Sequence, residues 1–85
     1  MSTIKVVNNL TDHSVSIKKT KLKVNDEDNF EQLSDWCDDN LTNNGFYELD
    51  ATERTFIIAI EDDEPNWKVN FDEVVVKVQK YVDSL

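Results

Sequence analysis

The sequence predicts an α+β domain with a small antiparallel sheet and two helices packed on one face, in the order ββ-α-βββ-α. Two observations support this class. Short β-branched runs occur in both halves of the chain, and two longer stretches carry apolar residues at helical spacing. With 85 residues and 39% hydrophobic residues, the chain suffices for one domain, 1–85, with a thin core.

The first 24 residues predict a hairpin followed by an irregular segment. "TIKVV" (3–7) and "SVSI" (14–17) are strand-like, and "NNLTDH" between them is turn-like. Val15 and Ile17 fall on one face of a strand, whereas Leu22 and Val24 fall on the other, which indicates a bulge or turn near Lys19. The lysines at 18, 19, 21 and 23 suit an exposed edge strand.

A helix is expected over residues 27–43. Asn25 or Asp26 can cap its first turn, which is rich in the negative charge that a helix N-terminus favours. Gly45 is placed to end it in a left-handed conformation. Its apolar stripe consists of Phe30, Leu33, Trp36, Cys37 and Leu41.

The second half predicts three strands and a terminal helix. "FYEL" (46–49) is a short strand, "RTFIIAI" (54–60) is apolar on both faces and predicts a central strand, and "WKVNF" (67–71) predicts a last strand. Asn70 and Glu73 form a partial capping box. An apolar stripe from Phe71 to Leu85 then predicts a helix, with a strand for "VVVKV" as the alternative.

Charge is distributed unevenly along the chain, whose net charge is −9. Residues 1–25 are basic, residues 65–85 are balanced, and residues 26–64 carry nearly all of the excess carboxylates, with Arg54 as their only cation. We therefore expect no direct binding to nucleic acid, because its phosphates would be repelled. The pattern favours a basic protein partner, or else simple solubility.

Enzymatic chemistry finds little support. The only histidine, His13, falls in a predicted turn, and Cys37 lies among carboxylates as a half-buried helix thiol. Glycine-rich phosphate loops and metal-binding spacings are absent from the sequence. We expect no enzyme, no cofactor and no disulfide. Since neither a signal peptide nor a long apolar run occurs, we expect a soluble cytoplasmic protein that does not enter membranes.

A calcium loop fits poorly. Aligning Gly45 with the required glycine of an EF-hand puts Asn40 at the first ligand position and Ala51 where the bidentate glutamate belongs. We therefore assign no metal ligands. A weak calcium module remains a third hypothesis, because the acidic turn "EDDE" (61–64) could hold a cation loosely.

The candidate site is an acidic helix face together with that turn. Glu31, Asp35 and Asp38 follow one another at i, i+4 and i+7, with no lysine four residues away to neutralise them. Its predicted partner-binding residues are Asp28, Glu31, Asp35, Asp38, Asp39, Glu61, Asp62, Asp63 and Glu64.

These residues suit an acidic inhibitor that occludes the basic groove of a nucleic-acid-binding enzyme, as a DNA mimic does. Small acidic anti-restriction and anti-CRISPR proteins of phages and mobile elements, and nuclease immunity proteins, offer an analogy of size and charge only. The alternative is a small adaptor domain that binds through strand-edge and apolar surfaces, its acidic face merely solvated.

Overall fold

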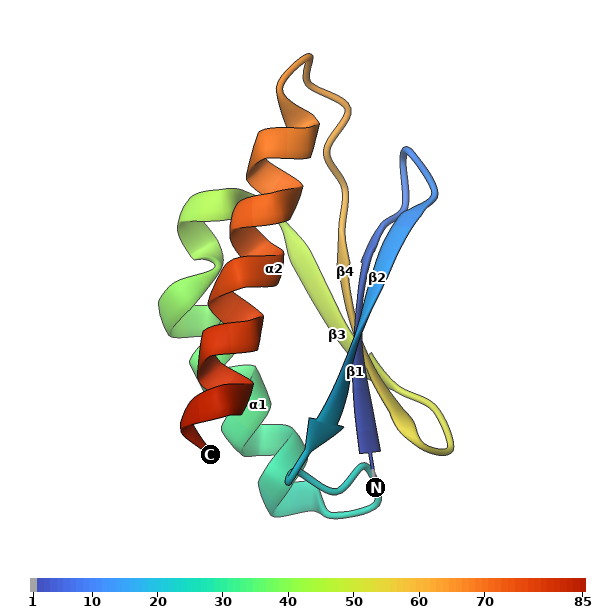
Figure 1. The fold of residues 1–85 in the computed structure, drawn as a ribbon, viewed down its shortest axis with the longest axis vertical. Coiled ribbons are helices and arrows are strands. Elements are labelled where there is room, and N and C mark those ends of the chain that lie inside the picture. Colours follow the sequence, from blue (N-terminus) through green and yellow to red (C-terminus); the bar gives the residue numbers. More distant parts are fainter. Residues whose placement is uncertain (1) are drawn as a thin grey trace.

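The computed structural model describes residues 2–85, and the side chains of all of these except Ser2, Lys18 and Lys19. Two hairpins form one sheet: β1 (Ser2–Asn8) with β2 (His13–Thr20), and β3 (Tyr47–Ala51) with β4 (Thr55–Ile60). Helix α1 (Glu27–Asn40) and the 3-10 turn η1 (Thr42–Asn44) connect the hairpins, and α2 (Trp67–Ser84) follows β4. Both helices cover the same face of the sheet (Figure 1).

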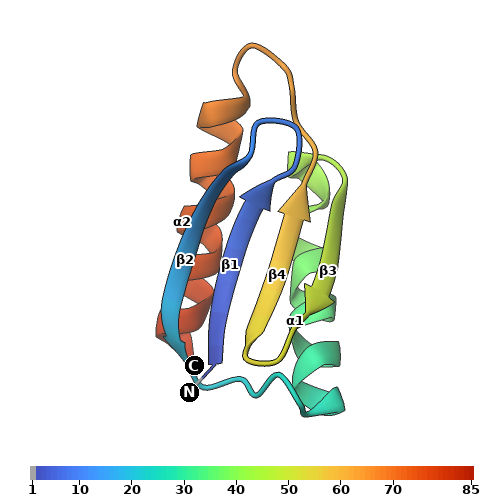
Figure 2. The same ribbon diagram turned by 90° about the vertical axis from the view of Figure 1, so that its right-hand side faces the viewer.

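The predicted class is confirmed, and two details of the sheet are corrected. The strand order is β2-β1-β4-β3, so the strand at 54–60 is central as predicted. The two hairpins of the sheet are joined by parallel pairing of β1 with β4, so the sheet is mixed and not wholly antiparallel. Periodicity within a strand carries no information about the direction of its neighbour. Here α1 reverses the chain between the hairpins, and the two middle strands therefore run the same way (Figure 2).

The second correction concerns "WKVNF" (67–71), which is the first turn of α2 and not a strand. Its alternation of Trp67, Val69 and Phe71 imitates a strand. In the structure Val69 faces solvent, whereas Trp67 and Phe71 lie one helical turn apart and both contact the ring of His13. That contact also corrects the placement of His13, which is the first residue of β2 and half-buried between aromatic rings, not a polar turn residue.

The predicted bulge in β2 is present. Ile4 pairs with Ile17 and Ser2 pairs with Thr20, so β2 holds one extra residue opposite β1. Ile17 and Thr20 are both buried although they are three residues apart, and Leu22 follows Thr20 into the core. The strand edge therefore extends to Thr20, and residues 21–26 are irregular.

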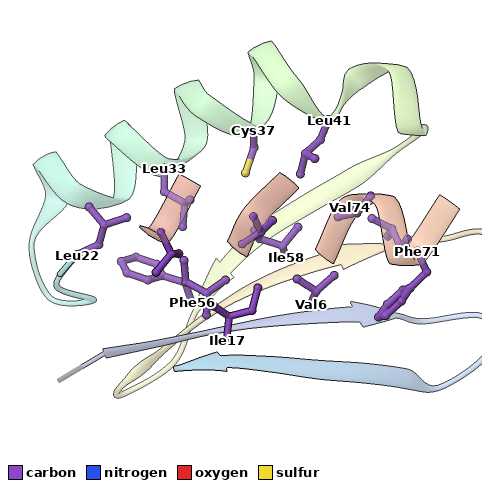
Figure 3. Packing of buried hydrophobic residues seen from close by; sticks show 14 residues of the cluster. Val6, Ile17, Leu22, Leu33, Cys37, Leu41, Phe56, Ile58, Phe71 and Val74 are labelled. Carbon is purple, nitrogen blue, oxygen red and sulfur yellow. The ribbon is translucent and has the colours of Figure 1, made fainter. Parts of the chain in front are cut away.

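The core lies between the helices and one face of the sheet. Leu33 and Cys37 of α1, and Leu41 at its C-cap, point toward Phe56 and Ile58 of β4 (Figure 3). Phe71, Val74, Val78 and Val82 of α2 are also buried in this cluster. The opposite face of the sheet is left uncovered by helices (Figure 2).

Two valines of α2 provide a matched test of this packing. Val74 is 0% exposed and Val76 is 51% exposed. Replacing Val74 by alanine removes two buried methyl groups and leaves a cavity, so we expect a loss of about 2 kcal/mol in the free energy of unfolding. Val76→Ala should stay within about 0.5 kcal/mol of wild type. Urea denaturation of both variants measures the difference, and equal losses would contradict the assigned helix face.

Candidate functional site

Helix α1 presents its carboxylates on one side. At 3.6 residues per turn, six carboxylate side chains fall within about 120° of its circumference, opposite the apolar stripe. We call this set the acidic ridge; all of its members are exposed, and they are Glu27, Asp28, Glu31, Asp35, Asp38 and Asp39. The other flank of α1 faces α2, where Trp36 stacks on Tyr81 with ring centroids 4.6 Å apart and Gln32 donates to the Tyr81 hydroxyl. Five of the predicted site residues therefore share one surface, and Glu27 joins them.

The start of α1 is fixed by its cap. The Asp26 carboxylate accepts hydrogen bonds from the backbone N–H groups of Asp28 (2.9 Å) and Asn29 (3.4 Å). Of the two predicted caps, Asp26 is therefore the one used, and its carboxylate serves the fold. Glu27 and Asp28 in the first turn lie where the helix dipole favours negative charge.

The end of α1 is fixed from α2. The Lys77 ammonium donates to the carbonyl of Asn40 (3.1 Å) and to Oδ1 of Asn44 (2.7 Å). A cation at this point compensates the negative end of the helix dipole, since α1 has no basic residue in its last turn. Helix α1 ends at Asn40, earlier than the predicted residue 43, and Leu41 caps it. The turn η1 ends at Asn44, and Gly45 follows with φ +104° and ψ −164°. Its positive φ favours glycine, but ψ is extended, so the left-handed helical ending predicted for this helix is wrong.

None of the ridge carboxylates forms an ion pair with a side chain that the structure describes. The ion pairs seen between described side chains are Lys68–Asp72 (2.6 Å) and Lys77–Glu73 (3.4 Å), and both lie within α2. Asp38 is nevertheless engaged, because the hydroxyl of Tyr47 in β3 donates to its carboxylate. The pKa of Tyr47 is raised, mainly by burial and to a smaller extent by this hydrogen bond. Asp38 thus ties the ridge to β3.

The predicted acidic turn 61–64 lies at the end of the molecule opposite the start of α1 (Figure 1). Asp62 is half-buried and serves the fold: its Oδ1 accepts from the N–H of Glu64 (3.0 Å) and its Oδ2 from the side-chain amide of Asn70 (2.9 Å). Glu61, Asp63 and Glu64 are exposed. Of the four predicted residues in this turn, three therefore remain free to meet a partner without breaking a side-chain bond shown here.

Asn70 joins this turn to the end of α1. Its amide donates to the carbonyl of Asn44 (2.9 Å), and the Asn44 amide donates back to Oδ1 of Asn70 (2.8 Å). From the other side, the fully buried Asn8 donates to the carbonyl of Asp62 (2.9 Å) and accepts from its N–H (3.2 Å). These bonds span 26 to 54 residues along the chain, so no local pattern in the sequence indicated them.

A further acidic pair lies elsewhere. Glu48 and Asp50 alternate along β3 with Tyr47 and Leu49, which face the helices, so these two carboxylates belong to the uncovered face of the sheet. The carboxylates of the ridge and of β3 therefore flank the same edge strand from its two sides, and they do not form one flat surface. Figure 2 shows β3 at that edge with α1 behind it.

Cys37 is not part of this surface. Its side chain is 0% exposed, which corrects the half-buried thiol expected from the sequence. Burial, with a smaller contribution from Asp38, raises the pKa of the thiol to about 12. Among residues 2–85, no group of three His, Cys, Asp or Glu side chains lies close enough together to hold a metal ion. Neither helix of this part of the chain is long and apolar enough to cross a membrane.

No protein-family model matches the chain, and no curated protein or solved structure matches it.

The buried thiol gives a prediction for alkaline pH. Below about pH 9 the thiol is protonated in both the folded and the unfolded chain, so it does not change stability. Between about pH 9 and pH 12 the unfolded chain ionises first, and the free energy of unfolding should fall by up to about 1.4 kcal/mol per pH unit more than in Cys37→Ala. Urea titrations from pH 8 to about pH 10.5 measure this, and parallel curves for both proteins would contradict the buried thiol.

Proposed function

We propose that this protein is a non-enzymatic inhibitor that binds a basic, nucleic-acid-binding enzyme and occludes its groove. The observation that carries the proposal is the acidic ridge: six exposed carboxylates on one side of a rigid helix, none of them in an ion pair with a described side chain. A solvated helix face usually mixes charges of both signs, because like charges at i and i+4 destabilise a helix.

The spacing of the ridge resembles that of a nucleic-acid strand. Glu27 and Asp39 are twelve residues apart, which corresponds to about 18 Å along a helix that rises about 1.5 Å per residue. Six charges over this length give about one charge per 3 Å, and one strand of duplex DNA carries one charge per about 3.4 Å. A groove lined with Arg and Lys to hold phosphates could therefore accept the ridge, with carboxylate–guanidinium hydrogen bonds in place of phosphate contacts.

The mechanism is occupation without turnover. The unbalanced charge steers the protein toward a positive groove, and the fixed helix presents its carboxylates without a folding step on binding. Tyr47 holds Asp38 within the ridge, and the exposed Glu61, Asp63 and Glu64 add negative charge outside it. We propose that this takes place in the cytoplasm, where a restriction enzyme, a CRISPR effector or a nuclease would be the kind of target. A single cysteine without a disulfide partner suits that compartment.

Charge reversal on the ridge tests the proposal. We would immobilise wild-type protein and the Glu31, Asp35, Asp39→Lys variant, expose both to bacterial lysate at low salt, and elute with a salt gradient. Asp38 is left intact because Tyr47 uses it. We expect wild type to retain a basic nucleic-acid enzyme that duplex DNA competes away, and the variant to bind that enzyme at least about tenfold more weakly.

An equal change of charge on α2, Asp72, Glu73, Asp83→Lys, is the matched control. The control variant should retain the enzyme as wild type does. Circular dichroism and thermal melting must show that both variants are folded. Equal capture by the ridge variant and wild type, or partners insensitive to salt, would contradict occlusion by the ridge and favour the adaptor hypothesis instead.

A further inference from the structure

The two edges of the sheet are protected unequally. An unpaired strand edge can form backbone hydrogen bonds with another strand, and proteins usually prevent this with lysines, prolines or bulges. Strand β2 carries a bulge and ends in a lysine-rich sequence, "KKTKLK" (18–23). Strand β3, at the other edge, pairs with β4 in unbroken register and contains neither lysine nor proline. Edge β3 is therefore the one open to an added strand.

The free backbone groups of β3 follow from its pairing. The N–H of Thr52 donates to the carbonyl of Thr55 (2.8 Å), so this pair is hydrogen-bonded and the bonded pairs alternate from there along the hairpin. Asp50 and Glu48 consequently bond to β4, whereas the N–H and C=O groups of Tyr47, Leu49 and Ala51 point to the free edge. The N–H of Ala51 is covered by the carboxylate of Asp50 at 2.8 Å.

Carboxylates flank this edge on both sides. Glu48 and Asp50 lie on the uncovered face of the sheet. On the helix face, Asp38 accepts the hydrogen bond of Tyr47, and Glu27 and Glu31 lie on the same β3-facing flank of α1 by helical spacing. A strand added beside β3 would therefore have negative charge above and below it, and cationic side chains would be favoured on both of its faces.

We propose that β3 docks an extended, Lys- and Arg-rich segment of the basic partner as an additional strand of the sheet. This inference rests on the proposed function and names how the partner binds. Main-chain hydrogen bonds to Tyr47 and Leu49 supply the pairing, as in other cases of strand addition. At Ala51 the arriving strand replaces the Asp50 carboxylate, and a cation of that strand gives Asp50 a new partner. A neutral strand would displace the Asp50 carboxylate without offering it a cation in return.

The test removes one outward donor without touching the internal ladder. The chain can be made from two synthetic segments joined between Trp36 and Cys37, with N-methyl leucine at position 49. N-methyl serine at position 16 is the matched control, because the N–H of Ser16 points outward on the β2 edge. Thr3 and Asn9 donate toward β4, so the residues of β1 between them that face the other way bond to β2. Their partners in β2 are Val15 and Ile17, which leaves Ser16 facing outward. Thermal melting verifies that both proteins fold.

The probe is the capped peptide acetyl-Thr-Lys-Arg-Val-Lys-Arg-Thr-amide, compared with a neutral version in which Gln replaces Lys and Arg. Amide hydrogen exchange is followed residue by residue by NMR. We expect the basic peptide to slow exchange at Tyr47 and Leu49 in wild type by about tenfold. The neutral peptide should leave exchange unchanged, the control with N-methyl serine should behave as wild type, and the protein with N-methyl leucine should lose protection at Tyr47.

Each other outcome overturns a separate claim. The peptide could shift the resonances of α1 until they saturate and yet leave amide hydrogen exchange at Tyr47 and Leu49 unchanged. That result would overturn strand docking and would be consistent with occlusion by the ridge. Protection that persists in an Asp28, Asp35, Asp39→Lys variant, whose substitutions lie on the flank of α1 away from β3, would support strand docking and overturn the ridge as the binding surface. Protection from exchange that the peptide causes at the β2 edge would overturn the proposal. Protection at Tyr47 that is present without peptide and disappears when the protein is diluted would also overturn it, because a second copy of the chain would then occupy β3. A peptide that changes no resonance up to its solubility limit overturns it too.

Discussion

The packing of α1 against β4 is the interaction on which the rest of the molecule depends. The ridge carboxylates repel one another, and α1 contains no cation to offset them. A helix of fourteen residues with such a face would be marginal in isolation. Leu33, Cys37 and Leu41, each fully buried against the sheet, supply the apolar burial that holds it in place. The charged surface is therefore stable because its opposite side is buried.

The hydrogen bonds around Asn70 and Lys77 convert that packing into a fixed geometry. Both residues lie on α2, and both reach the segment where α1 ends. Asn70 also holds Asp62, so the acidic turn, η1 and α2 form one connected network with the buried Asn8. Since buried polar groups are costly when unpaired, such a network tolerates few alternative arrangements. The acidic side chains gain a rigid base from it, which favours binding without a loss of conformational entropy.

The sequence predicted the elements better than their pairing. The hairpin bulge, the capped acidic helix, the central position of 54–60 and the apolar stripe of α2 all follow from local periodicity, and the structure confirms them. Trp67, Val69 and Phe71 misled because a strand and a helix turn can present the same short alternation. The roles of Asp62 and Tyr47 depend on contacts distant in the chain, and the parallel β1–β4 pair depends on topology, so neither could be read from spacing. The same limit explains why the sequence joined the acidic helix face and the turn 61–64 in one site, whereas the structure places that turn at the end of the molecule opposite the start of α1 (Figure 1).

The proposed occlusion requires that the ridge and a nucleic acid compete for the same groove. Its most direct test is a titration of this protein into the basic enzyme retained by wild-type bait, with that enzyme holding fluorescently labelled duplex DNA. Fluorescence anisotropy reports the bound DNA, and sedimentation reports the composition of each complex. We expect each bound protein molecule to release one DNA molecule, with no species containing all three components. A stable ternary complex of enzyme, DNA and this protein would contradict it.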